Sequence, residues 1–204
     1  MKSCIIIPAR FQSSRFPGKP LANILGKPMI IWVAEISANT VGIENTFIAT
    51  DHPSIHDVVT SFGYNVILTK SSCLTGTDRV AEASMGLDYD YFINVQGDEP
   101  LINPRDIKRF IDYMPNVPPS TILNGYAYLS EHDDVLSANI PKIVTDLNDQ
   151  LLYISRAAIP SSKSSTNLHT YRFKKQVCIY GFTKNQLQAF YEFDMKSPLE
   201  SIED

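Results

Sequence analysis

Strand-like and helix-like segments alternate through residues 1–115 of the chain. Residues 4–7 form a continuous apolar run that ends at Pro8, which is typical of a strand buried on both faces. The same patterns predict further strands at 46–49, 64–68 and 91–95 and helices at 29–38, 53–61, 77–85 and 104–114. Strands separated by helices indicate βαβ units, so this part is predicted to be an α/β fold with a parallel sheet.

The pattern changes after Pro118. The strand-like runs that follow it are 121–129, 142–147, 151–155 and 176–182. Asn148-Asp149 separates two of these runs and is typical of a hairpin turn, so an antiparallel portion is predicted here. Thr183 is expected to cap a helix that runs to about residue 193.

The charge balance excludes some classes of function. The 204 residues include 18 basic and 22 acidic side chains, a net charge of −4, whereas nucleic-acid binding needs many clustered cations. No apolar run approaches the ~20 residues of a membrane span. We therefore expect no nucleic-acid or membrane partner. The three scattered cysteines argue against disulfides and favour a cytoplasmic location.

A basic loop follows the first predicted strand. Residues 8–20 carry Arg10, Arg15 and Lys19, and Ser13 and Gly18 add a hydroxyl and a backbone N–H group. In an open parallel sheet, ligands bind beyond the carboxyl ends of the strands. Three cations so close together favour an anion of high charge such as a triphosphate. The loop has neither the Walker pattern nor the GxGxxG pattern.

An acidic turn follows the fourth predicted strand, at the same edge of the sheet. In Gln96-Gly97-Asp98-Glu99-Pro100, a carboxylate near phosphates is a natural Mg²⁺ ligand. Asp98 is the first candidate for this ligand, but spacing alone does not exclude Glu99.

Two further segments add polar groups. Residues 74–79 supply small residues, hydroxyls and a helix N-terminus with Thr77 as its expected cap, an arrangement suited to a nucleoside base or ribose. Arg156 follows a strand in the second half, where it could hold a substrate carboxylate.

Taken together, eight motifs in order resemble the 3-deoxy-manno-octulosonate cytidylyltransferases, also called CMP-Kdo synthetases. They are IIIPARFQSSRFPGKPL (5–21), ATDH (49–52), TGTDRVAE (75–82), INVQGDEPLI (93–102), PKIVTD (141–146), YISRAAIP (153–160), CIYGF (178–182) and SPLE (197–200). The resemblance covers the whole chain. It implies a Rossmann-like nucleotide-diphospho-sugar transferase fold with a mixed, mostly parallel sheet flanked by helices, and usually a homodimer. The implied reaction joins CMP from CTP to a 3-deoxy-ulosonic acid and releases pyrophosphate, with Mg²⁺ as cofactor.

The resemblance also implies roles for individual residues. Catalytic roles would fall to Arg10, Lys19 and Asp98, with Asp98 as the Mg²⁺ ligand. The nucleotide would be bound by Pro8, Ala9, Arg10, Ser13, Arg15, Lys19, Gly76, Thr77 and Arg79. The sugar would be bound by Gln96, Arg156, Gln176 and Tyr180. Residues 1–204 would form one cytidylyltransferase domain, with a nucleotide-binding half at about 1–115 and a sugar-binding and dimerisation half at about 118–204.

Two departures from the family pattern bear on function. Gln176 stands where the family often carries a histidine, which leaves the identity of the sugar open. Family members also continue past the SPLE segment, which begins a helix, and supply a second Mg²⁺ carboxylate there. We therefore expect the second half to be incomplete at its C-terminus. The alternatives are a nucleotide-binding fragment without turnover and a nucleotidyltransferase for another sialic-acid-like sugar or another nucleotide.

Overall fold

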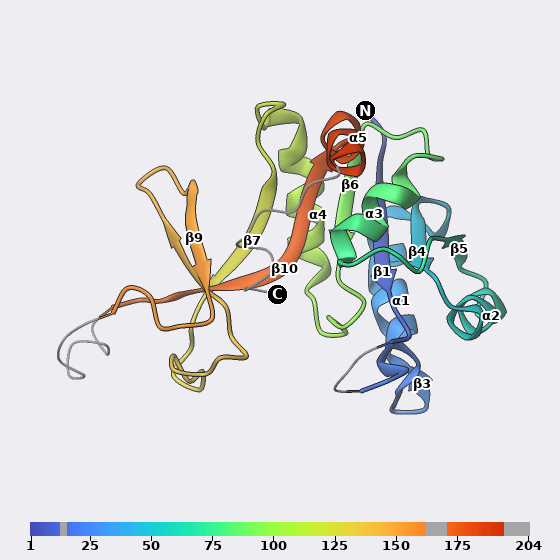
Figure 1. Cartoon of the computed structure of the whole chain (residues 1–204), viewed down its shortest axis with the longest axis horizontal. Helices are drawn as coiled ribbons and strands as arrows, with labels where there is room; N and C mark the ends of the chain where they lie inside the picture. The colour runs from blue at the N-terminus through green and yellow to red at the C-terminus, as the bar shows by residue number, and fades with distance from the viewer. Residues whose placement is uncertain (13–15, 162–170, 194–204) are drawn as a thin grey trace. The chain divides into compact units, whose positions relative to one another are not determined.

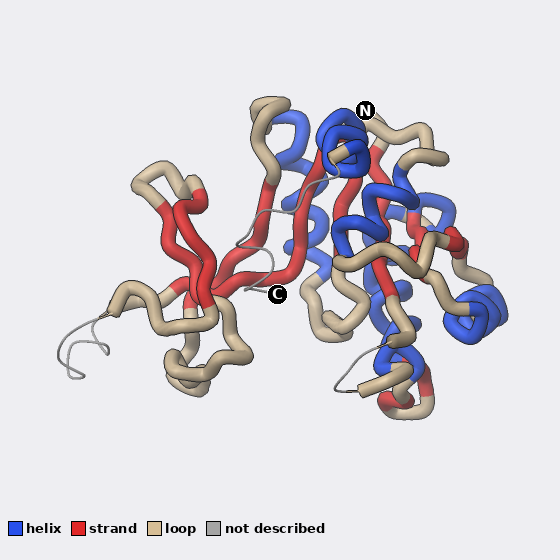
Figure 2. Tube along the Cα trace, viewed as in Figure 1, coloured by secondary structure: helices blue, strands red, loops and turns tan. Residues whose placement is uncertain are grey.

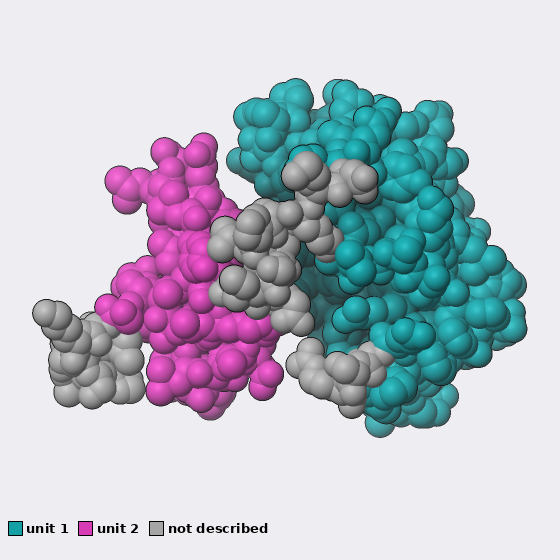
Figure 3. Space-filling view, in the orientation of Figure 1, with its two compact units in different colours: residues 1–123, 178–194 teal, residues 124–177, 195–204 magenta. Residues whose placement is uncertain are grey.

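The computed structural model describes residues 1–12, 16–161 and 171–193. The chain divides into two compact units, residues 1–123 with 178–194 and residues 124–177 with 195–204 (Figure 3). Ser13, Arg15 and the helix predicted to begin at Ser197 lie outside the described residues.

The first unit is built on a mostly parallel sheet in the order β5-β4-β1-β6-β10 (Figure 1). Its strands are β1 (Ser3–Ala9), β4 (Thr46–Thr50), β5 (Asn65–Leu68), β6 (Tyr91–Val95) and the end of β10 (Lys174–Thr183). The first four strands are parallel and β10 runs antiparallel to β6. The predicted α/β fold with a mixed, mostly parallel sheet is confirmed.

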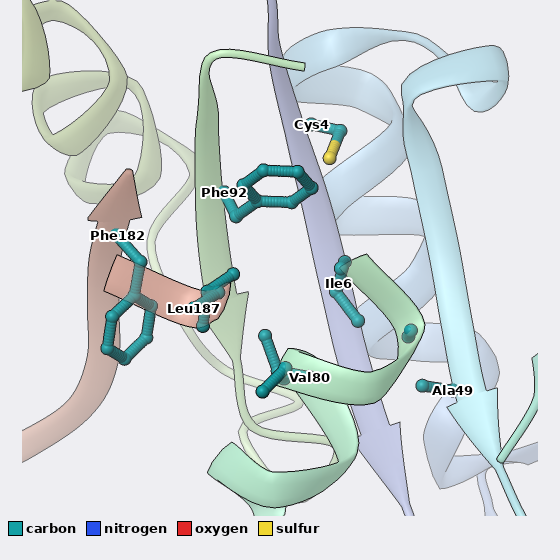
Figure 4. Packing of buried hydrophobic residues seen from close by; sticks show 9 residues of the cluster. Cys4, Ile6, Ala49, Val80, Phe92, Phe182 and Leu187 are labelled. Atoms are coloured by element: carbon teal, nitrogen blue, oxygen red, sulfur yellow. The ribbon is translucent and has the colours of Figure 1, made fainter. Parts of the chain in front are cut away.

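Helices cover both faces of this sheet. They are α1 (Met29–Val41), α2 (Pro53–Ser61), α3 (Gly76–Ser84), α4 (Pro104–Tyr113) and α5 (Lys184–Glu192), with short 3-10 turns η1 (Lys19–Leu21), η2 (Ile43–Asn45) and η3 (Met114–Asn116) and a small hairpin of β2 (Asn23–Ile24) and β3 (Lys27–Pro28). α3 and α5 pack together on one face, while α1 and α4 pack on the other (Figures 1 and 4). No described helix has the length and apolar character needed to cross a membrane.

Polar caps fix where these helices begin. Thr183 caps α5, as predicted, and Gln186 completes a capping box with it. The prediction that Thr77 caps the third helix was wrong. Thr75 is the cap, because Asp78 lies three residues later and its side chain accepts from the Thr75 backbone N–H at 2.6 Å.

Apolar side chains from strands and helices form the core of the first unit. Cys4, Ile6 and Phe92 come from the sheet and meet Val80 of α3 and Leu187 of α5 (Figure 4). Each of these five residues has no solvent exposure. Burial on both faces explains the continuous apolar run of β1.

The second unit is antiparallel. β8 (Lys142–Thr145) pairs with β9 (Leu151–Ser155) and with the start of β10, and β7 (Leu123–Tyr128) also pairs with β10. The described residues between β7 and β10 form strands and loops (Figure 2). The predicted hairpin is confirmed, with Asp149 at φ +59 in its turn.

Candidate functional site

The loops that follow β1 and β6 meet the start of α3 at one edge of the sheet. β1 and β6 are adjacent and parallel, so both loops leave from their carboxyl ends. A Cβ atom added to Gly97 would lie 2.8 Å from the Pro8 carbonyl oxygen, and one added to Gly76 would lie 3.1 Å from Gln96 Nε2. The structure thus brings Pro8, Gly76, Gln96 and Gly97 into contact, as the topology predicted.

The close approach at Gly97 predicts a steric effect of substitution. In Gly97→Ala the new methyl would also lie 3.0 Å from Ile30 Cδ1, so a buried backbone or side chain must shift. We expect a loss of about 1–3 kcal/mol in the free energy of unfolding and weaker nucleotide binding. Urea unfolding and nucleotide titration measure both.

Gly86→Ala is the matched control. Gly86 has no atom within 4 Å of the added Cβ, and neither glycine has a positive φ. The free energy of unfolding of Gly86→Ala should change by less than about 0.5 kcal/mol. Equal effects of the two substitutions would mean that the Pro8–Gly97 contact does not constrain the site.

An ion pair joins the two loops. Lys19 Nζ lies 2.6 Å from Asp98 Oδ2, although the two residues are 79 positions apart in the sequence. Their side chains are 43% and 47% exposed. Gly18, at φ +72, turns the chain into η1 just before Lys19. A cation and a carboxylate therefore face solvent side by side at the edge of the sheet.

The neighbouring Glu99 differs from Asp98 in its surroundings. Burial raises the pKa of Glu99, the Asp98 carboxylate raises it further, and Lys19 opposes both effects. Asp98 is exposed and paired with Lys19, whereas Glu99 is partly buried. Its greater exposure makes Asp98 the more accessible candidate for a metal ligand, a choice that spacing alone left open.

The donor set at Asp98 suits Mg²⁺ held with few protein ligands. The described residues contain no cluster of three His, Cys, Asp or Glu side chains that could hold a metal ion. Mg²⁺ keeps several waters and commonly uses one or two carboxylates together with substrate phosphates. Asp98, an exposed carboxylate beside the cationic Lys19, offers one such ligand.

An aromatic stack anchors the basic loop. The rings of Phe11 and His52 are stacked with centroids 3.9 Å apart at 13°. His52 in turn caps α2, since its Nδ1 accepts from the Ser54 backbone N–H at 3.2 Å. Arg10 is exposed beside this anchor, whereas Pro8 and Ala9 are buried in β1. The sequence does not predict this stack, because no motif pairs Phe11 with His52.

Arg79 is buried among protein partners. Its side chain is 3% exposed, Nη2 lies 3.3 Å from Asp51 Oδ2, and Nη1 donates to Thr69 Oγ1. It therefore joins α3 to the ends of β4 and β5. Direct recognition of cytidine, implied by the resemblance, would require this guanidinium to leave those partners. Gly76 and Thr77 are partly exposed at the start of the same helix.

The residues assigned to the sugar fall into two pairs. In the first unit, Tyr180 pairs across the sheet with Asn94, and Gln96 Nε2 donates to Asn94 Oδ1 at 3.3 Å. In the second unit, Gln176 donates its backbone N–H to Pro141 O at 3.0 Å, and Arg156 Nη1 donates to Ala138 O at 3.0 Å.

Comparison with known proteins gives consistent matches. The family model described as "Cytidylyltransferase" matches residues 4–204. The 3-deoxy-manno-octulosonate cytidylyltransferase of Escherichia coli is 35% identical, over 99% of this chain and 81% of that protein. An 8-amino-3,8-dideoxy-manno-octulosonate cytidylyltransferase of Shewanella halifaxensis is 38% identical, over 100% of this chain and 82% of that protein.

Solved structures agree with these matches. The structure of a CMP:2-keto-3-deoxy-manno-octonic acid synthetase complexed with CTP has a TM-score of 0.86 and 34% identity, and the match covers 98% of this chain and 82% of that one. HddC from Yersinia pseudotuberculosis has a TM-score of 0.67 and 16% identity, and the match covers 96% of this chain and 81% of the HddC chain. At this identity the match supports a shared fold only.

Proposed function

We propose that this chain, which belongs to the cytidylyltransferase family, transfers CMP from CTP to 3-deoxy-D-manno-octulosonate (Kdo) or a close ulosonic acid and releases pyrophosphate. The names of the relatives support this substrate class, as does the CTP complex of the 34% identical structure. The observation that carries the proposal is the Lys19–Asp98 pair at the carboxyl edge of β1 and β6. The product would serve lipopolysaccharide or capsule synthesis.

The reaction needs charge neutralisation and alignment more than covalent catalysis. The anomeric hydroxyl of the sugar attacks the α-phosphorus of CTP, a new P–O bond forms, the bond to the β-phosphate breaks, and the hydroxyl proton is released. Lys19 and Arg10 would bind the triphosphate, together with Arg15, which lies outside the described residues. Mg²⁺ bound at Asp98 would supply further neutralisation of phosphate charge.

The Lys19–Asp98 pair has to exchange partners when substrate binds. Both side chains are nearly half exposed, and such ion pairs contribute only about 0–1 kcal/mol. A triphosphate offers Lys19 a higher negative charge, and a divalent cation offers Asp98 a higher positive charge. The ion pair can therefore keep Lys19 and Asp98 at the site. Because it contributes little free energy, the substrate can replace it.

This exchange predicts unequal effects of Lys19→Ala on two nucleotides. Loss of the cation should weaken CTP binding by about 1.5–3 kcal/mol, because charge-assisted contacts to the outer phosphates disappear. CMP lacks those phosphates and should lose much less. Calorimetric titration of both nucleotides measures the difference.

Lys108→Ala is the control, since Lys108 is also exposed and ion-paired, with Asp112 on α4. It should leave the affinity for both nucleotides unchanged. Equal losses of CTP and CMP affinity in Lys19→Ala would contradict the assignment of Lys19 to the outer phosphates.

The remaining residues that the resemblance singles out are assigned to the nucleoside or to the sugar. Pro8, Ala9, Gly76 and Thr77 would lie beside the nucleoside, with Arg79 acting indirectly by holding α3 in place. The residues assigned to the sugar are Gln96 and Tyr180 in the first unit and Arg156 and Gln176 in the second, with Arg156 assigned to the sugar carboxylate.

A homodimer is part of the proposal. The β8–β9 hairpin exposes apolar side chains, with Leu152 at 64% and Leu147 fully exposed. Light scattering would measure the mass in solution, and a monomer would contradict this part.

The three free cysteines support a reducing, cytoplasmic setting.

A substrate panel tests the proposed function. Pyrophosphate release is measured with CTP, UTP and GTP, each with Kdo and with its 8-amino analogue. Turnover confined to CTP with one of the two sugars is the expected result. Binding of CTP without turnover would favour a nucleotide-binding protein, and turnover with UTP or GTP would favour a different nucleotidyltransferase.

A further inference from the structure

A lysine is buried in the second unit with no carboxylate partner among the described residues. Lys142, the first residue of β8, has no solvent exposure. Its Nζ donates to two backbone carbonyl oxygens, Ser137 O at 2.8 Å and Arg156 O at 2.6 Å. Within the described part of the chain, no carboxylate lies within 4.0 Å of this ammonium. Burying a charge in this way is unfavourable, so it calls for a specific role.

The electrostatics of Lys142 agree with its burial. Burial lowers the pKa of this amine, nearby Asp134 opposes that effect, and the Arg156 charge lowers the pKa further. A packing role alone would be filled as well by an apolar side chain of similar volume, which often replaces a buried charge without loss of stability.

The contacts of Lys142 converge on Arg156. Lys142 of β8 lies opposite Ser155, the last residue of β9. Arg156 is the next residue along the chain after Ser155. The Lys142 ammonium fixes the backbone carbonyl of Arg156, and the Arg156 guanidinium donates to Ala138 O at 3.0 Å. Ala138 is the neighbour of Ser137, which Lys142 also holds. Lys142 therefore binds the Arg156 backbone directly, and it also binds the residue next to the carbonyl that accepts from the Arg156 guanidinium.

We propose that Lys142 is a positioning residue for the ulosonic acid, and that it acts by fixing the guanidinium of Arg156 for the sugar carboxylate. This inference rests on the proposed function and gives a role to Lys142 of the PKIVTD segment, to which the resemblance assigned none. Lys142 does not touch the substrate in this account. Its loss should therefore affect the KM of the sugar and leave nucleotide binding intact.

Steady-state kinetics of Lys142→Met test the inference. We expect the KM for Kdo to rise by roughly tenfold, since a small misplacement of a substrate-positioning group has effects of this order or larger. The CTP affinity should stay within about twofold, because the nucleotide residues lie in the other unit. Lys142→Gln retains an N–H donor for a carbonyl and should recover part of the loss.

A double-mutant cycle separates positioning from general stability. If Lys142 acts through Arg156, adding Lys142→Met to Arg156→Met should raise the KM for Kdo little further. Lys174→Met is the control, because Lys174 lies in the same unit but pairs with Asp149. It should leave both KM values unchanged.

Different results would overturn the role of Lys142 and the proposed function. Independent, multiplicative effects of Lys142→Met and Arg156→Met, or equal losses for CTP and Kdo, would overturn the role of Lys142 alone. If Lys142→Met does not fold, Lys142→Gln carries the same cycle. Absence of turnover by the unmodified chain with CTP and an ulosonic acid would instead overturn the proposed function, and this inference with it.

Discussion

Replacing Asp98 with asparagine is expected to lower Mg²⁺-dependent turnover by about 100-fold or more while the chain stays folded. An amide is a poorer ligand for a hard cation than a carboxylate, and loosened phosphate geometry has large effects on rate. The fold should survive, because Asp98 is exposed and such ion pairs contribute little to stability. Pyrophosphate release against Mg²⁺ concentration and thermal unfolding measure the two effects.

Glu99→Gln is the matched control for this substitution. Glu99 is partly buried and therefore less accessible to a metal ion than Asp98, so its variant should keep the Mg²⁺ dependence of the unmodified chain. If Asp98→Asn keeps its metal dependence and Glu99→Gln loses it, the metal ligand is Glu99.

Replacing Arg79 with methionine is expected to destabilise the first unit by about 3–5 kcal/mol, because breaking a buried ion pair leaves an uncompensated charge. Asp51 would be that charge. Its Oδ2 lies 3.3 Å from Arg79 Nη2, and its buried Oδ1 has no hydrogen-bond partner among the described residues. Urea unfolding measures the loss of stability.

Two further variants make this prediction specific. Arg109→Met removes an exposed arginine that pairs with Asp106 and should change stability by less than about 0.5 kcal/mol. Adding Asp51→Asn to Arg79→Met should restore part of the lost stability, since the unpaired charge is then gone. A small effect of Arg79→Met alone would contradict the buried pairing.

The fold and the location of the site followed from local patterns and one topological rule. Apolar runs and helix caps predicted the strands and helices of the first unit, because burial on both faces of a parallel sheet leaves a continuous apolar signature. The rule that ligands lie at the carboxyl ends of strands put Lys19 and Asp98 at one edge. The structure places their side chains 2.6 Å apart.

The sequence patterns did not predict which side chains contact one another. The stack of Phe11 on His52 and the pairing of Arg79 with Asp51 depend on how segments pack in space. The choice between Asp98 and Glu99 depends on burial, which no spacing encodes. The burial of Lys142 was unexpected because a lysine in a strand is usually predicted to reach solvent.

Phosphorus NMR of the chain mixed with CTP, Kdo and Mg²⁺ tests the proposed reaction most directly. CTP should be converted to a phosphodiester that joins CMP to the sugar, together with an equal amount of pyrophosphate. The Asp98→Asn variant should leave CTP unchanged over the same time. Conversion of UTP or GTP in place of CTP, or pyrophosphate release that does not depend on the sugar, would contradict the assignment of this chain as a cytidylyltransferase acting on an ulosonic acid.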